Sequence, residues 1–376
     1  MNAQGTTPPP FDIDAILTDP VRLPAVGADP GGVRELGRSR DGRPIVGYHL
    51  GQGPCRVSLI GGCHADEPVG PAMLERLVSY LNALPQDAPV LQAHSFSVVP
   101  HANPDGGVRN APWTTEAFST PGGDLDAELD LVDYLRKAIR ELPGDDVEFG
   151  FPRSADDDGA RPENRAVADF LRRHGPFHLH ASFHGMAFAA GPWFLLEHAW
   201  ADPTVRPGLD PAVGDRTAAM RESLRTLVRA MGYALHDIDR GGEKGFFRID
   251  EGFTSRPDSR AMVAHFEALG DHLTADLFRP SSMEFVGSLG GDPLTLVSEM
   301  PLFITPGDLY RRKELIRPTE IADLRAAALA AKDTASADDV RHRAEGLGVY
   351  AMPLDHQMRL QLEFLAAGLR VVDTRA

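Results

Sequence analysis

Polar side chains of types that bind metal ions follow several predicted strands, at the point where each strand ends. His64 and Glu67 come after the apolar segment 56–60, and His184 closes the segment 177–183. Two imidazoles and one carboxylate are a common catalytic zinc set, because they leave a fourth position open for water. The sequence therefore predicts one zinc ion per chain, held by His64, Glu67 and His184.

The His-x-x-Glu spacing of the first two residues also occurs a second time, at His342 and Glu345. Context separates the two pairs, as short motifs require. The first pair has a strand and a double glycine before it and a helix after it. The second lies in a helical tail without a preceding strand, so we interpret it as a solvated helix face.

Three histidines compete for the third ligand position. His178, His180 and His184 share one parity along a predicted strand, so all three point to the same face of the sheet. His184 stands at the strand end, directly before Gly185, and is the favoured ligand, with His180 as the main alternative. For His178 and His180 we favour hydrogen-bonded positions in the core.

A further carboxylate, Glu299, closes the apolar strand 294–298, and the turn 103–106 follows the strand 95–99. In open α/β sheets, ligands bind at the carboxyl ends of the strands, so we expect these residues near the zinc ligands. A zinc-bound water has a pKa near 7. Glu299 could take its proton and pass it to a leaving nitrogen, as general base and then acid. The alternative is an ordinary salt bridge at a strand end.

Hydrophobic periodicity predicts the elements that position these side chains. Strands are predicted at 45–50, 56–60, 95–99, 177–183 and 294–298, and helices at 69–81, 129–139, 163–173, 211–231, 260–276, 319–332 and 354–368. This alternation indicates an α/β fold of three layers, α/β/α, around a mostly parallel mixed sheet. We divide the chain into an irregular N-terminal arm (1–30), a catalytic domain (31–315) with an insertion near 113–160, and a helical C-terminal extension (316–376).

Composition limits the partners. The chain of 376 residues carries a formal net charge of -16, which argues against nucleic acid and anionic membranes as partners. It contains no apolar run long enough to span a bilayer and no recognisable signal peptide, so a cytoplasmic location is expected. Cys55 and Cys63 are interpreted as two reduced thiols at the ends of a buried strand. The oligomeric state is not predicted.

Several of these segments together resemble the zinc carboxypeptidases, the carboxypeptidase A-like metallopeptidase family. The similar segments are 35–39 with 42–45, Gly61-Gly62-Cys63-His64-Ala65-Asp66-Glu67-Pro68, Asn103-Pro104-Asp105-Gly106, Glu163 with 168–171, and Leu296-Val297-Ser298-Glu299. The resemblance implies a zinc carboxypeptidase-like fold, His184 as the third ligand and Glu299 as the general base. It also implies hydrolysis of an amide bond in a peptide substrate.

The resemblance also suggests residues around the substrate. Arg109 follows the Asn-Pro-Asp-Gly turn, where similar amidases carry an arginine that stabilises the developing oxyanion. The alternative for Arg109 is a surface position. Asn103, Asn110 and Asp126 are carried over as substrate-binding positions.

The chain departs from the family where the substrate's terminal carboxylate is bound. Asp126 and Ala127 stand where the family has asparagine and arginine, and no tyrosine lies between Tyr233 and Tyr310. A carboxylate in a dry pocket needs a charge-assisted partner. Peptides with a free C-terminal carboxylate are therefore predicted to be poor substrates, unless another segment, the insertion above all, supplies an arginine. The candidates from elsewhere are Arg153, Arg161 and Arg248.

The leading hypothesis is a zinc-dependent amide hydrolase, nearer the bacterial amidase-like or aspartoacylase-like members of the family. One alternative is an acylase or deacylase of aspartoacylase type, acting on acylated amino acids. Another is a catalytically inactive metal-binding regulatory protein. Glu299 argues against the last, because a pure binding module needs no placed base.

Overall fold

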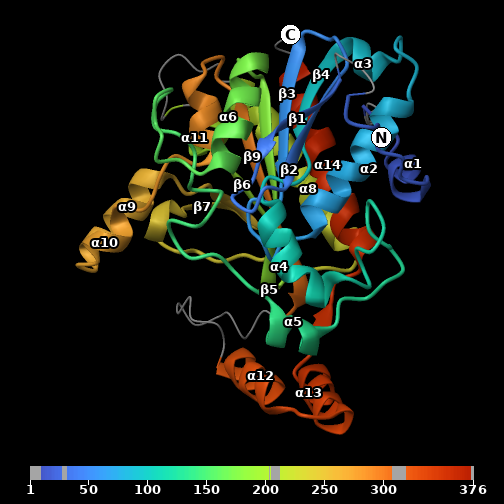
Figure 1. Cartoon of the computed structure of the whole chain (residues 1–376), viewed down its shortest axis with the longest axis vertical. Helices are drawn as coiled ribbons and strands as arrows, with labels where there is room; N and C mark the ends of the chain where they lie inside the picture. The colour runs from blue at the N-terminus through green and yellow to red at the C-terminus, as the bar shows by residue number, and fades with distance from the viewer. Residues whose placement is uncertain (1–9, 28–31, 203, 205–211, 307–318, 374–376) are drawn as a thin grey trace, which may run out of the picture.

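The computed structural model describes residues 10–27, 32–202, 204, 212–306 and 319–373, which form a layered α/β structure (Figure 1). The sheet has the strand order β1-β2-β4-β3-β5-β9-β6-β8-β7, with β10 paired to β9. Its strands are β1 Val33–Arg38, β2 Pro44–Leu50, β3 Cys55–Gly61, β4 His94–Val99, β5 Leu179–Ala189, β6 Trp193–Leu196, β7 Arg248–Asp250, β8 Phe253–Ser255, β9 Leu294–Ile304 and β10 Tyr350–Ala351.

Four neighbouring strands at the centre of the sheet, β4, β3, β5 and β9, are parallel. The pairs β1–β2, β2–β4, β9–β6 and β7–β8 are antiparallel. The central strands are buried over nearly their whole length, as expected for parallel strands covered on both faces. The predicted α/β class with a mostly parallel mixed sheet is confirmed.

Helices cover both faces of the sheet (Figure 1). Helices α2 and α14 pack on β3, β5 and β9, while α6 packs on β1 and β2, and α11 on β5. The helices are α1 Ile13–Thr18, α2 Val69–Ala83, α3 Pro89–Ala93, α4 Pro104–Thr114, α5 Leu131–Lys137, α6 Pro162–His174, α7 His198–Ala201, α8 Ala212–Ala230, α9 Ser259–Ala268, α10 His272–Ala275, α11 Ser282–Ser288, α12 Thr319–Ala330, α13 Thr334–Gly346 and α14 Leu354–Val372.

Three expectations about the elements need correction. The N-terminal arm, predicted to be irregular, contains α1, which buries Ile13, Ile16 and Leu17. The helix predicted at 260–276 is interrupted at Gly270, whose φ is +76°. His184 and Glu299, predicted to close their strands, lie within them, because β5 and β9 pair with each other over nearly their whole length and continue to Ala189 and Ile304.

The C-terminal helices differ in how they join the rest of the protein. Helices α12 and α13 pack beside α5 at one end of the molecule (Figure 1), where Arg136 donates hydrogen bonds to the carbonyl oxygens of Ala328 and Ala331. Helix α14 instead lies in the core, with most of its side chains buried. The predicted division into domains stays a prediction. Helix α14, however, belongs to the central layers and is not a peripheral extension.

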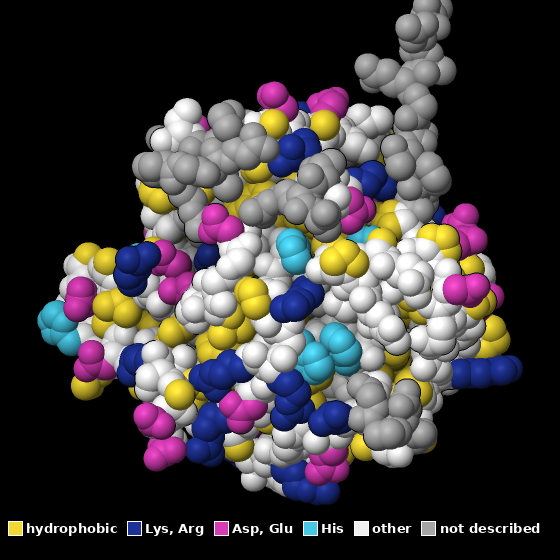
Figure 2. Space-filling model, turned by 90° about the horizontal axis from the view of Figure 1, so that it is seen from above, with side chains coloured by type: hydrophobic (Ala, Val, Ile, Leu, Met, Phe, Trp, Pro, Cys, Tyr) yellow, Lys and Arg dark blue, Asp and Glu magenta, His cyan; other side chains and the backbone are white. Residues whose placement is uncertain are grey.

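Charge is unevenly distributed over the surface. Figure 2 shows Lys and Arg side chains gathered around neighbouring histidines on one face, although the whole chain has a net charge of -16. The predicted absence of a nucleic-acid partner therefore stays a prediction. In the part of the chain that the structure describes, no helix is both long and apolar enough to cross a membrane.

Candidate metal centre

The three predicted zinc ligands converge on one point. His64 Nδ1 lies 2.9 Å from Glu67 Oε1, and His184 Nδ1 lies 3.0 Å from His64 Nδ1 and 2.9 Å from Glu67 Oε2. Ligand atoms of a tetrahedral zinc ion at 2.0–2.1 Å lie about 3.3 Å from one another. Outward shifts of a few tenths of an ångström would thus accommodate the ion, so the donor set and its geometry fit zinc.

The approach of α2 to the middle of β5 places these side chains together. His64 and Glu67 lie in the turn between β3 and α2, and His184 lies on β5. At Gly70, in the first turn of α2, an added Cβ would come within 2.4 Å of the carbonyl oxygen of Phe183. A residue without a side chain is required here, so that the helix can begin against the strand that carries His184.

Two carboxylates hold the outer nitrogens of the histidine rings. His184 Nε2 lies 3.3 Å from Glu148 Oε2 and 2.7 Å from Ser182 Oγ, and His64 Nε2 lies 3.5 Å from Asp146 Oδ1. A carboxylate in this position fixes the ring of a metal-binding histidine and increases its basicity. Sequence reasoning missed Asp146 and Glu148, because they lie in the irregular insertion and match no motif.

Strong electrostatic interactions link the ligands to one another and to their neighbours. Burial and Arg140 lower the pKa of His64, but Glu67 and Asp146 outweigh them and raise it to about 9. Burial also lowers the pKa of His184, but Glu67 and Glu148 outweigh it and raise this pKa well above its usual value. Zinc binds neutral imidazole, so metal must displace these protons and should bind more weakly in acid.

Glu299 lies next to the three ligands. It is the register partner of His184 in the parallel pair β5–β9. Burial and, to a lesser extent, the negative charge of Glu67 raise the pKa of its carboxyl group to about 8. A carboxyl group that titrates near neutrality can both accept and return a proton at pH 7.

An arginine that the sequence did not point to also reaches the centre. Arg140 Nη2 lies 3.0 Å from His64 Nδ1, and Arg140 Nη1 lies 2.9 Å from Asp66 Oδ1 and also contacts Glu67 Oε1. The next residue, Glu141, accepts a hydrogen bond of 3.2 Å from the backbone N–H of Ala65. This bond docks the insertion onto the turn that carries the ligands.

Arg109 and Asn103 lie one step further away. Arg109 Nη2 donates to Glu141 Oε1 at 2.7 Å, and its side chain is 46% exposed. Asn103 caps α4 by accepting from the N–H of Gly106 at 3.0 Å, and its Nδ2 donates to Glu141 Oε1 at 2.8 Å. Both side chains thus meet Glu141 rather than the ligand atoms.

The two remaining predicted substrate residues, Asn110 and Asp126, make local contacts. The amide of Asn110 is occupied at both ends, by the carbonyls of Gly106 and Ile139 and by the N–H groups of Ile139 and Trp113. Asp126 is exposed, and its N–H donates to Asp124 Oδ1. These contacts stabilise the local chain, and the substrate-binding roles stay predictions.

The competing histidines lie elsewhere. His180 is fully buried, with Nδ1 2.8 Å from Ser58 Oγ and Nε2 3.1 Å from Ser282 Oγ, as expected for a core histidine. His178 Nδ1 accepts from the backbone N–H of Arg56. His342 and Glu345 are exposed on α13, in agreement with a solvated helix face.

A cavity of about 300 Å³ adjoins the centre. It is lined by Asp66, Tyr134, Leu135, Ala138, Ile139, Arg140 and Arg325. Arg325 comes from α12. The cavity therefore has an arginine from the insertion and another from the C-terminal helices.

Comparison with known families supports the resemblance. Residues 32–193 match the family model described as zinc carboxypeptidase. This segment contains His64, Glu67 and His184 and ends before Glu299. The match covers less than half of the chain and includes most of the segments that carry the resemblance.

The individual proteins that resemble the chain are named as carboxypeptidases. The chain is 29% identical over 170 residues to carboxypeptidase E of Caenorhabditis elegans. The aligned segment covers 40% of this chain and only 36% of that protein. A metallo-carboxypeptidase from Burkholderia cenocepacia has a TM-score of 0.46 and 18% identity, covering 92% of this chain and 66% of that chain. A Pseudomonas aeruginosa metallo-carboxypeptidase, in complex with (2-guanidinoethylmercapto)succinic acid, has a TM-score of 0.42 and 18% identity, covering 91% and 65%.

The outer carboxylate of His184 can be tested by replacement. We expect Glu148→Gln to weaken zinc binding about 10- to 100-fold, because the charge that supports the ring is removed while the shape is kept. Chelator competition at neutral pH measures the change. Glu163→Gln is the matched control, since Glu163 is also buried but pairs with Arg161. Equal affinities in the wild type and Glu148→Gln would contradict the assignment.

Proposed function

We propose that the protein is a zinc-dependent hydrolase that cleaves an amide (peptide) bond with metal-activated water. The observation that carries the proposal is the convergence of His64, Glu67 and His184 beside Glu299. One zinc ion at this centre would polarise the scissile carbonyl and lower the pKa of a bound water to about 7. The family match over residues 32–193 supports the same reaction class.

Glu299 would move the proton in this reaction. It would accept a proton from the attacking water and return it to the leaving nitrogen. Its place on β9, paired along ten positions with β5, holds the carboxyl group on a rigid element beside His184. A base on a rigid strand is kept in reacting geometry better than one on a loop.

Arg140, rather than Arg109, would stabilise the oxyanion. Arg140 contacts His64 and Glu67 directly, so its guanidinium would lie near a carbonyl bound at the metal. Arg109 is paired with Glu141 on the outer side of the same segment. A preorganised cation at the position where negative charge develops accelerates acyl transfer reactions.

The protein would recognise a terminal carboxylate with residues other than those that the family uses. The sequence predicts poor action on free C-terminal peptides only on condition that no other segment supplies an arginine. The insertion brings Arg140 to the centre, and Arg325 lines the adjoining cavity. We therefore propose that a substrate carboxylate is accepted in this cavity, without a role for positions 126 and 127.

Two variants test the metal and the base separately. His64→Ala should lose one zinc equivalent and the activity, because a ligand is removed. Glu299→Gln should retain the fold and that zinc but lose about 100- to 10,000-fold in kcat, because only the proton acceptor is missing. Substrates are a panel of peptides and acylated amino acids, with metal content measured by elemental analysis. Near-normal turnover in Glu299→Gln would mean that the base has been misassigned.

A pair of arginine variants tests the oxyanion and carboxylate roles. Arg140→Ala should reduce kcat/KM about 100- to 1,000-fold, the usual effect of removing one oxyanion donor. Arg109→Ala, the matched control, should change it only a few-fold. Each is assayed on one peptide as free acid and as C-terminal amide, and the wild type should prefer the acid. A larger loss in Arg109→Ala, or a wild-type preference for the amide, contradicts this proposal.

A further inference from the structure

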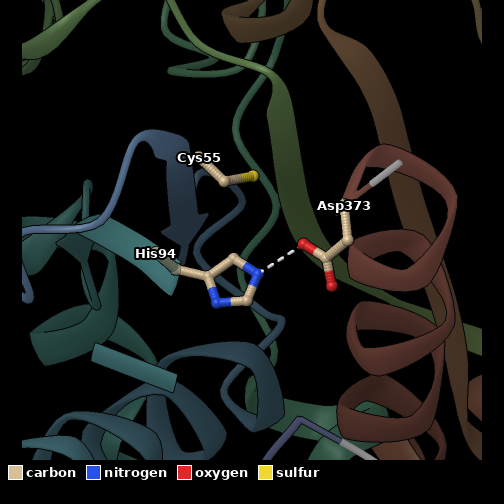
Figure 3. A group of neighbouring side chains, drawn as sticks. All are labelled: Cys55, His94 and Asp373. Atoms are coloured by element: carbon tan, nitrogen blue, oxygen red, sulfur yellow. Dashed lines mark hydrogen bonds and ion pairs between the residues drawn. The ribbon is translucent and has the colours of Figure 1, made fainter. Parts of the chain in front are cut away.

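A second group of side chains with metal-binding chemistry lies at the other end of the same strands. Cys55 and His94 are the first residues of β3 and β4, and Asp373 caps the C-terminal end of α14. Their side chains point toward one another (Figure 3), and one ligand atom from each lies within 4.8 Å of the others. Since His64 and Glu67 follow the opposite end of β3, this group is separate from the proposed zinc centre.

Both ring nitrogens of His94 face oxygen acceptors. Nδ1 lies 3.1 Å from the carbonyl oxygen of Val90, which can only accept, so Nδ1 carries a proton. Nε2 lies 2.7 Å from Asp373 Oδ1. When Nδ1 donates to the carbonyl, the lone pair of Nε2 faces the carboxylate. A metal ion bound by both Nε2 and Asp373 Oδ1 would satisfy the two groups after a small outward shift of the ligand atoms.

Cys55 favours a metal ion over a proton alone. Its side chain is buried, and the sulfur points toward the gap between the imidazole and the carboxylate (Figure 3). Burial and, to a lesser extent, the charge of Asp373 raise the pKa of this thiol to about 12. The sulfur therefore stays protonated without metal. A bound divalent cation would stabilise the thiolate instead. The bond from His94 to a backbone carbonyl is also typical of metal-binding histidines.

We propose that Cys55, His94 and Asp373 form a second metal site, for Zn²⁺ or a similar transition-metal ion. Thiolate and imidazole select such ions over Mg²⁺ and Ca²⁺. Three protein ligands leave one position for water, and the side chain of Asp373 is 40% exposed, which gives the ion a route from solvent. Binding releases the thiol proton and any proton on Nε2 to solvent.

The site would fasten one end of α14 to the sheet. Helix α14 covers β5 and β9, and its last turn meets the starts of β3 and β4 through the side chains drawn in Figure 3. The ion would replace the His94–Asp373 ion pair with a three-way link. Total zinc content would then be two per chain, one at each site.

Cobalt titration of the full chain distinguishes this site from the first. Thiolate bound to Co²⁺ gives a charge-transfer band in the near ultraviolet, whereas a centre of two histidines and a glutamate has no thiolate. The chain contains only two cysteines, so Cys63→Ser is a matched control. We expect the band in the wild type and in Cys63→Ser, and its loss in Cys55→Ser. Absence of the band from the wild type, or its persistence in Cys55→Ser, would overturn the proposal.

A second variant guards against misfolding of Cys55→Ser. Asp373→Asn keeps the shape of the side chain at an exposed position, so the fold should be retained. We expect it to bind one zinc equivalent less than the wild type after dialysis against limiting chelator, with unchanged hydrolytic activity. Zinc content equal to that of the wild type would contradict the site. The cobalt band and the zinc content do not depend on whether the other centre is catalytic.

Discussion

The parallel pairing of β3, β5 and β9 is the constraint on which the rest of the site depends. Strand β3 ends level with Phe183, whereas β5 and β9 continue past this point, so the turn after β3 lies beside residues in the middle of these two strands. The register between β5 and β9 sets His184 beside Glu299. The turn after β3 then needs only the close approach of α2, at Gly70, to bring His64 and Glu67 to the same place.

Gathering charged groups in a buried place is unfavourable unless each is paired. Desolvation alone would cost several kcal/mol for an isolated ion. Here Asp146 and Glu148 balance the imidazoles from outside, and Arg140 balances Glu67. The irregular insertion therefore supplies much of the electrostatic support of the centre. Segments with no regular structure can thus determine whether the ligands are held in place to bind a metal.

Periodicity and strand ends made part of the site predictable from the sequence, whereas the contributions of the loops were missed. The three ligands and Glu299 follow the apolar segments predicted as strands, so their meeting could be predicted, although β5 and β9 continue beyond His184 and Glu299. Arg140 and Glu148 could not, because the path of an irregular segment depends on contacts such as Glu141 with the N–H of Ala65. The position of Arg109 after a turn pointed to the site, but a single hydrogen bond to Glu141 directs its side chain elsewhere.

The central claim is that His64, Glu67 and His184 hold one zinc ion in a geometry that leaves room for water. A crystal structure of the zinc-loaded protein, with anomalous differences collected at the zinc edge, tests it most directly. We predict a peak about 2.0–2.2 Å from His64 Nδ1, His184 Nδ1 and a carboxylate oxygen of Glu67. A fully loaded crystal with no peak at this position, or a peak bound by other residues, would contradict it.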